Sequence, residues 1–169
     1  RIALIGGGTI AQLVLEHVRD RSLGAFDVAA LMGRPGGAPR GPSLARQFGV
    51  PYVERRDELI ALRPEAVIEA ASHEAVRQHL LPLLDAGIGV VVLSAGALID
   101  DGLRNEAEQA AARSGALLFV PSGGIGGLDV LKTACLAGVD QVSIQVAKPP
   151  AAWKGIPYVE ERGVPLDAI

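Results

Sequence analysis

Residues 2–11 read IALIGGGTIA, a short apolar run that is followed at once by three glycines. Such a run is typical of a buried β-strand, and the residues after the glycines follow the pattern of an amphipathic helix. The spacing Gly6-x-Gly8-x-x-Ala11 between a strand and a helix is the pattern of a dinucleotide-binding turn. Gly6 permits a tight turn, Gly8 leaves room for a pyrophosphate, and the small Ala11 lets the helix pack close to the strand.

The helix expected after the glycines gives a second reason to place a phosphate here. The first N–H groups of a helix have no acceptor within it, and the helix dipole puts partial positive charge at that end. An ordinary strand-to-helix turn without a ligand is the alternative, since glycine patterns of this length are common. On the dinucleotide interpretation, Gly6, Gly8 and Ala11 hold the pyrophosphate, and Thr9 and Ile10 are further cofactor-binding residues of the same turn.

The composition suits a parallel sheet covered by helices. Of 169 residues, 49% are hydrophobic and 4% aromatic, so aliphatic side chains must form the core. The formal net charge of −3 provides no basic surface, and we expect neither nucleic acid nor a membrane as a partner. Cys135 is the sole cysteine, which excludes an intrachain disulfide and favours a reducing, cytoplasmic location. The sequence has no zinc-ligand spacing, so no metal site is expected.

Apolar runs and helical patterns alternate along the first 120 residues. Buried strands are predicted over 2–5, 26–32, 50–53, 66–70, 89–93 and 116–120. Helices are predicted over 9–19, 43–48, 57–62 and 73–86, and Asp100 or Asp101 is predicted to cap a further helix that ends at about 114. The Gly- and Pro-rich stretch 33–42 is expected to be a mobile, irregular loop. This alternation favours an α/β fold with a Rossmann-type, doubly wound parallel sheet.

The composition of the sequence changes after residue 120, where PSGGIGG occupies positions 121–127. So many glycines do not suit a packed core. The patterns that follow predict a helix over 128–137, a strand over 141–147 and an irregular, Pro-rich tail over 148–169. We therefore expect a dinucleotide-binding domain, 1–120, and the incomplete beginning of a smaller α/β substrate domain, 121–169.

The end of the second strand bears on the choice between NAD and NADP. In Rossmann units this position normally carries an acidic residue that binds the adenosine ribose, but here the sequence is Gly33-Arg34. Without a carboxylate to repel it, a 2′-phosphate could pair with the Arg34 guanidinium. Alternatively, Arg34 points into solvent. The expected cofactor is therefore NAD or NADP.

Small residues follow the fourth and fifth predicted strands, at the sheet edge where ligands bind in open α/β folds. They leave room for a dinucleotide, although helix capping by Ser72 and loop formation at Gly96 would explain the same residues. The candidates for the cofactor groove are Ala70, Ala71, Ser72 and Ser94.

Three histidines and one lysine are the remaining candidates. His17 and His79 lie within predicted helices and are interpreted as structural, with His79 on a solvent-facing side. His73 follows a strand end and could contact the cofactor or lie on the surface of the first helical turn. Lys148, at the end of the last predicted strand, could pair with a substrate carboxylate or be solvated.

Five segments in this order and spacing resemble the L-aspartate dehydrogenase family: 6–11 (GGGTIA), 69–76 (EAASHEAV), 93–98 (LSAGAL), 121–129 (PSGGIGGLD) and 148–150 (KPP). The segment 121–129 is the most distinctive of them. The resemblance implies an NAD(P)-dependent oxidoreductase that transfers hydride from the Cα of L-aspartate to NAD(P). Its product, iminoaspartate, either feeds NAD biosynthesis or hydrolyses to oxaloacetate and ammonia.

The resemblance also implies roles for particular residues. Ser122, Gly123 and Gly124 would lie beside the nicotinamide, and the family usually has Ala at the last of these positions. The family's catalytic histidine and a cofactor-binding asparagine lie past the segment that matches Ile169, so the catalytic residues stay unassigned. L-Aspartate is the expected substrate, and a homo-oligomer is expected.

Two other functions stay open, because a Rossmann fingerprint is shared by many enzymes. The first is another two-domain Rossmann reductase, similar to homoserine dehydrogenase or dihydrodipicolinate reductase. The second is a non-catalytic module that binds NAD(P) and thereby changes its affinity for a partner.

Overall fold

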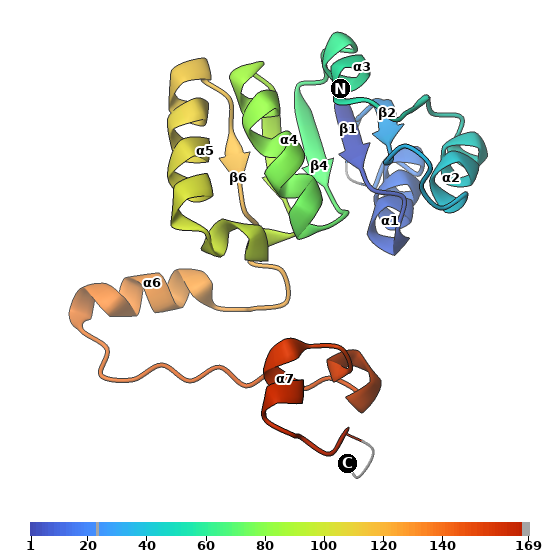
Figure 1. Cartoon of the computed structure of the whole chain (residues 1–169). Helices are drawn as coiled ribbons and strands as arrows, with labels where there is room; N and C mark the ends of the chain where they lie inside the picture. The colour runs from blue at the N-terminus through green and yellow to red at the C-terminus, as the bar shows by residue number, and fades with distance from the viewer. Residues whose placement is uncertain (23, 167–169) are drawn as a thin grey trace. The chain divides into compact units, whose positions relative to one another are not determined.

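A parallel sheet forms the core of residues 1–126 in the computed structural model, which describes residues 1–22 and 24–166 (Figure 1). Within these residues the sheet has six strands in the order β3-β2-β1-β4-β5-β6, and every neighbouring pair is parallel. The strands are β1 (Ile2–Ile5), β2 (Val28–Met32), β3 (Tyr52–Val53), β4 (Ala66–Glu69), β5 (Gly89–Val92) and β6 (Leu118–Phe119). The strand order reverses between β1 and β4, and the predicted doubly wound, Rossmann-type sheet is confirmed.

Helices cover both faces of this sheet, as the alternation along β1 requires. Leu4 packs into one buried cluster, while its neighbours Ala3 and Ile5 pack into another, because successive side chains of a strand point to opposite faces. The Leu4 cluster lies against α1 (Thr9–Arg19) and α2 (Arg40–Phe48). The other cluster lies against α3 (Arg56–Ala61), α4 (His73–Asp85), the 3-10 helix η1 (Ala95–Ile99) and α5 (Asp101–Ser114).

Side-chain hydrogen bonds define where the two long helices on the second face begin. The Ser72 hydroxyl accepts a hydrogen bond from the Ala75 N–H at 3.2 Å and caps α4. The Asp100 carboxylate accepts from the Leu103 N–H at 3.2 Å and caps α5, so Asp100 is the cap of the two candidates. These caps place the beginnings of both helices at the carboxyl edge of the sheet.

Pro82 lies inside α4 and cannot donate to the Gln78 carbonyl, one turn earlier. The Arg56 Nη1 donates to that carbonyl instead, at 3.0 Å. A side chain of α3 thereby supplies the hydrogen bond that the proline removes from α4.

The structure corrects several predicted boundaries in this part of the chain. The second strand begins at Val28, not at residue 26, because Phe26 lies in an exposed segment without regular secondary structure. The interpretation of 33–42 as irregular was wrong at its end, since α2 begins at Arg40. Pro42 lies in the first turn of α2, where a missing N–H is tolerated. The amphipathic pattern predicts an apolar face of Ile10, Leu13, Val14 and Val18 on α1. In the structure Val18 is buried, together with Ala11 and Leu15, but Ile10 and Leu13 are half exposed.

The chain forms two compact units, Arg1–Gly126 and Gly127–Ile169. The second contains α6 (Leu128–Ala137), which was predicted, and two short helices in the tail that was expected to be irregular, η2 (Pro150–Trp153) and α7 (Pro157–Glu161). The assignment of 121–169 to a substrate domain stays a prediction.

The strand predicted over 141–147 was wrong. These residues form no regular secondary structure, and Val142, Ile144 and Val146 are each 50–60% exposed. Their apolar side chains alternate as in a strand, but a strand also needs a neighbour for its N–H and C=O groups. The described part of the chain provides no such neighbour for this segment.

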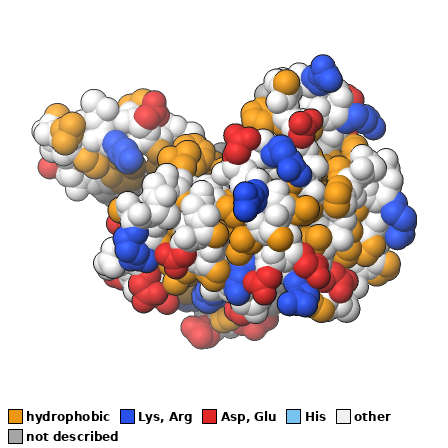
Figure 2. Space-filling view, turned by 90° about the horizontal axis from the view of Figure 1, so that it is seen from above, with side chains coloured by type: hydrophobic (Ala, Val, Ile, Leu, Met, Phe, Trp, Pro, Cys, Tyr) orange, Lys and Arg blue, Asp and Glu red, His pale blue; other side chains and the backbone are white. Residues whose placement is uncertain are grey.

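No helix in the described ranges is both long enough and apolar enough to cross a membrane. On the face drawn in Figure 2, Lys and Arg side chains are interspersed with Asp and Glu side chains, with apolar side chains between them.

Candidate functional site

The loop between β1 and α1 contains two glycines that the fold itself needs and one that it does not. Gly6 has φ +106°, and a Cβ there would lie 2.5 Å from the Ala70 carbonyl oxygen. A Cβ on Gly7 would lie 2.6 Å from the Cα of Gly41. A Cβ on Gly8 would meet no heavy atom of the described chain within 4 Å. Packing therefore does not explain Gly8, and its open backbone fits the close approach of a pyrophosphate.

The beginning of α1 is suited to the same ligand. Gly8 is its N-cap residue, and no described side chain caps this helix, in contrast to α4 and α5. Its first turn holds no acidic residue that would repel a phosphate. Ala11 is fully buried in the cluster that includes Leu4, as the predicted close packing of helix on strand requires. Thr9 and Ile10 are exposed beside the open glycine.

At the end of β2, Tyr52 fills the place where an acidic side chain would otherwise lie. A Cβ on Gly33 would overlap the Tyr52 hydroxyl, and a Cβ on Gly41 would lie 3.2 Å from the Tyr52 ring. Burial, with a smaller effect of the Glu54 charge, raises the pKa of Tyr52, so its hydroxyl stays protonated. A side chain at position 33 would therefore require Tyr52 to move.

Two arginines flank this region, one of which the sequence analysis missed. Arg34 is exposed on the loop after β2. This position is compatible both with a contact to a 2′-phosphate and with a solvated side chain. Arg40 begins α2, and its Nη2 donates to the Thr9 hydroxyl at 3.3 Å and to the Gln12 side-chain oxygen at 3.4 Å. Arg40 thus lies at the first turn of α1. A second arginine shortly after β2 could have indicated this position. It was missed because the Gly- and Pro-rich stretch 33–42 was expected to be irregular, whereas α2 begins within it.

The ends of β4 and β5 are joined by a buried carboxylate. Glu69 is 2% exposed, and its carboxylate accepts hydrogen bonds from the N–H groups of Ala71, Ser72 and Ser94 and from the Ser94 hydroxyl. The Ser72 hydroxyl caps α4, so the capping interpretation of this residue is correct in the structure. The predicted groove residues Ala70, Ala71, Ser72 and Ser94 therefore meet at one edge of the sheet.

A known protein family matches the part of the chain that contains the glycine loop and the carboxyl edge of β4 and β5. The model of the homoserine dehydrogenase NAD-binding domain matches residues 6–121, which is more than half of the chain. The chain belongs to this NAD-binding domain family. The glycine loop, the uncapped helix and the carboxyl edge of β4 and β5 all lie within the matched residues, so the cofactor is a nicotinamide dinucleotide, NAD or NADP.

Curated relatives are similar over a longer part of the chain. An L-aspartate dehydrogenase of Ralstonia nicotianae is 36% identical over 173 aligned residues, which cover 99% of this chain and 62% of the relative. L-Aspartate dehydrogenase 2 of Bordetella pertussis is 37% identical, covering 91% of this chain and 56% of the relative. The chain thus spans about three fifths of the length of these relatives.

Solved structures agree with the NAD-binding domain in fold. Biliverdin reductase from Synechocystis, in complex with biliverdin and NADP⁺, has a TM-score of 0.65 at 23% identity, covering 84% of this chain and 44% of that one. GenD2 from gentamicin A biosynthesis, in complex with NAD, has a TM-score of 0.64 at 20% identity, covering 81% of this chain and 38% of that one. At these identities the likeness concerns the fold alone.

The histidines have structural contacts. The His17 ring lies 2.8 Å from the Ser22 hydroxyl. A Cβ on Gly96 would lie 2.6 Å from the His73 ring, so His73 packs against η1. The expected solvent-facing position of His79 was wrong, because it is half-buried, and Nδ1 has no hydrogen-bond partner among the described atoms. Burial, with a smaller effect of the Arg56 charge, lowers the pKa of His79.

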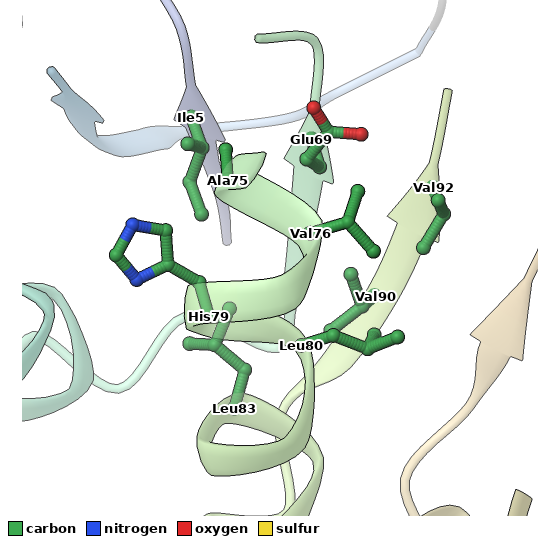
Figure 3. A pocket seen from close by; sticks show the side chains of 9 residues that line it. All are labelled: Ile5, Glu69, Ala75, Val76, His79, Leu80, Leu83, Val90 and Val92. Carbon is green, nitrogen blue, oxygen red and sulfur yellow. The ribbon is translucent and has the colours of Figure 1, made fainter. Parts of the chain in front are cut away.

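A narrow space between α4 and the sheet of the NAD-binding domain belongs to the core (Figure 3). Its lining is apolar except for two side chains, and it includes Ile5, Glu69, Ala75, Val76, His79, Leu80, Leu83, Val90 and Val92. In Figure 3 the Glu69 carboxyl group lies at the carboxyl end of β4, beyond Val76. The Glu69 carboxylate therefore makes its hydrogen bonds at the carboxyl edge of the sheet.

The remaining predicted site residues lie in the two units separately. Ser122, Gly123 and Gly124 belong to the first unit, in an exposed turn in which the Ile125 N–H donates to the Ser122 carbonyl at 3.2 Å. Lys148 belongs to the second, and its Nζ lies 5.4 Å from the centroid of the Trp153 ring. Lys148 is exposed, but the strand that it was expected to end is absent from the described residues.

Proposed function

We propose that the protein oxidises L-aspartate with NAD or NADP and releases iminoaspartate. The observation that carries this proposal is the 36% identity to an L-aspartate dehydrogenase over 99% of this chain. Because the chain spans about three fifths of such relatives, the activity and the substrate are inferred for the whole protein. When bound, the cofactor accepts the hydride from the substrate Cα, and the protein binds and orients both molecules.

In this function, the loop between β1 and α1 holds the pyrophosphate. The open backbone at Gly8 and the uncapped start of α1 support this role. Gly6 shapes the turn, Ala11 packs the helix on the strand, and Thr9 and Ile10 present the first N–H groups of α1.

The adenosine end of the cofactor is assigned to the region after β2. Tyr52 occupies the space that an acidic residue at position 33 would need, so a 2′-phosphate would meet no carboxylate at that position. Arg34 and Arg40 supply positive charge on either side of the intervening loop. These features favour NADP binding at least as tight as NAD binding.

The nicotinamide end is assigned to Ala70, Ala71, Ser72 and Ser94, together with Ser122, Gly123 and Gly124. Their place at the carboxyl edge of the second half of the sheet, or in the loop after β6, supports this assignment. Lys148 is assigned to a carboxylate of L-aspartate, since the chain is otherwise net acidic and a dicarboxylate needs local positive charge.

We place the protein in the cytoplasm as a homo-oligomer. Its single cysteine, which is exposed, suits a reducing compartment. Exposed apolar side chains in the second unit, which include Val130, Leu136 and Ile144, support further burial in an assembly.

The test is steady-state reduction of NAD⁺ and NADP⁺ by the full-length protein, followed by the absorbance of the reduced nicotinamide. Reduction that depends on L-aspartate is expected, and the reverse reaction should require oxaloacetate and ammonia together. Reduction with L-homoserine but not with L-aspartate would support the homoserine dehydrogenase alternative, which the name of the matching family favours. Cofactor binding without turnover of either amino acid would support a non-catalytic module.

A further inference from the structure

Glu69 is a charged side chain buried at the point where the strand order of the sheet reverses. It ends β4, which lies between β1 and β5, and it is 2% exposed. Burial of a carboxylate is costly unless hydrogen bonds replace its water. The hydrogen bonds that compensate the burial of Glu69 also fix the backbone and side-chain groups that donate them.

The hydrogen bonds of Glu69 connect two loops that are distant in sequence. Oε1 accepts from the Ala71 N–H at 2.8 Å, the Ser72 N–H at 3.0 Å and the Ser94 hydroxyl at 2.9 Å. Oε2 accepts from the Ser94 N–H at 2.9 Å. The carboxylate thus organises the loop after β4 and also fixes it to the loop after β5.

The same loop supports the glycine turn after β1. The Ala70 N–H donates to the Ile5 carbonyl at 2.9 Å, and a Cβ on Gly6 would lie 2.5 Å from the Ala70 carbonyl oxygen. Because Ala70 follows Glu69 directly, the turn at Gly6 packs against a backbone segment that the carboxylate holds in place. Three strand ends therefore share one organising side chain.

We propose that Glu69 is a positioning residue for the nicotinamide half of the bound dinucleotide. A doubly wound sheet binds the two mononucleotide halves on its two halves, across the point where the strand order reverses. By this rule the adenosine half would lie over β1–β3, where the glycine loop is, and the nicotinamide half over β4–β6. The loops that Glu69 joins are those of the nicotinamide half. The proposal rests on the dinucleotide site of the proposed function.

Glu69→Gln separates the two connections. The amide oxygen can keep the three donors that now reach Oε1, but the amide NH₂ then faces the Ser94 N–H, and two donors cannot bond to each other. The loop after β4 keeps its shape, while the loop after β5 loses its backbone connection. Glu74→Gln is the matched control, because it makes the same change on the exposed surface of α4.

The experiment compares two ligands on the full-length protein by calorimetric titration. One is the oxidised cofactor, NAD⁺ or NADP⁺, and the other is the same molecule without nicotinamide, ADP-ribose or its 2′-phosphate. Glu69→Gln should weaken binding of the whole cofactor about tenfold or more and change binding of the ADP-ribose ligand less than about twofold. Glu74→Gln should change neither.

Equal weakening of both ligands, or of neither, would overturn the positioning role. If the wild-type protein bound neither ligand, the proposed function would fail instead, so the two failures are distinguishable. Should Glu69→Gln not fold, Ser94→Ala provides the second test, since it keeps the N–H contact to Oε2 and removes one donor to Oε1. A smaller loss restricted to the whole cofactor is then expected, and an equal loss for both ligands would overturn the proposal.

Discussion

Replacement of Gly8 by valine should abolish dinucleotide binding and leave the fold almost unchanged. Gly8 has φ −85° and ψ −170°, which a valine adopts without strain, and a Cβ there meets no described heavy atom within 4 Å. The cost to the fold is the loss of a preferred N-cap residue, about 0.5–1 kcal/mol, which a stiffer unfolded chain partly offsets. The thermal midpoint should therefore fall by no more than about 2–4 °C.

The loss in binding should be much larger. Hydrogen bonds to a charged phosphate contribute about 1.5–3 kcal/mol each, so the loss of two N–H contacts weakens binding by about 3–6 kcal/mol. That corresponds to a roughly 10²- to 10⁴-fold higher Kd for NAD(P). Calorimetric titration measures the affinity, and thermal unfolding of the same samples measures the stability.

Gly6→Val is the contrasting variant. Position 6 has φ +106° and a backbone oxygen 2.5 Å from the new Cβ, so strain and overlap should destabilise the fold by about 2–6 kcal/mol. If Gly8→Val folded normally and bound NAD(P) with unchanged affinity, the assignment of this loop to the pyrophosphate would be refuted. If Gly8→Val lost as much stability as Gly6→Val, the inference that position 8 is open would be refuted.

Three further predictions concern the adenosine end, the substrate and the core. Arg34→Ala should weaken NADP binding by about 1.5–3 kcal/mol with little effect on NAD binding, and Arg40→Ala should act in the same direction. Titration with both cofactors measures the effect, and equal weakening of NAD and NADP binding would contradict a contact with the 2′-phosphate. Lys148→Met should raise the KM for L-aspartate several-fold while NAD(P) affinity stays within about a factor of two, ~0.4 kcal/mol; an unchanged KM would show that Lys148 is only solvated. Because burial lowers the pKa of His79, protonation favours the unfolded chain, and stability should fall as the pH drops below about 6.5. His79→Leu should flatten that part of the profile, and an identical dependence of the thermal midpoint on pH in the variant would rule out His79 as its source.

Much of the NAD-binding domain could be predicted because its signals are local. The apolar run 2–5, the glycine turn and the helix that begins at Thr9 are adjacent in sequence, and each follows from the conformations that its own residues permit. The same holds for the caps at Ser72 and Asp100, where a side chain bonds to an N–H three residues ahead.

Predictions failed where the decisive partner is distant in sequence. Residues 141–147 alternate as a strand should, but pairing depends on a neighbouring edge that the described chain does not provide. Arg40 was overlooked because its place beside Thr9 depends on how α2 packs, which no local pattern records.

The sequence by itself determined the parallel, doubly wound fold and the location of the glycine turn between β1 and α1, since both follow from periodicity and from glycines within a few residues of one another. Only the tertiary structure decided which glycine is open to a ligand, which side chain replaces the acidic residue after β2, and what joins β4 to β5. Gly8 is open because no described atom lies near it. Tyr52 and Glu69 have their roles because each contacts residues that are distant in sequence, Gly33 and Ser94. Hydrogen bonds and packing between distant segments arise only when the chain folds, and so they leave no local pattern in the sequence.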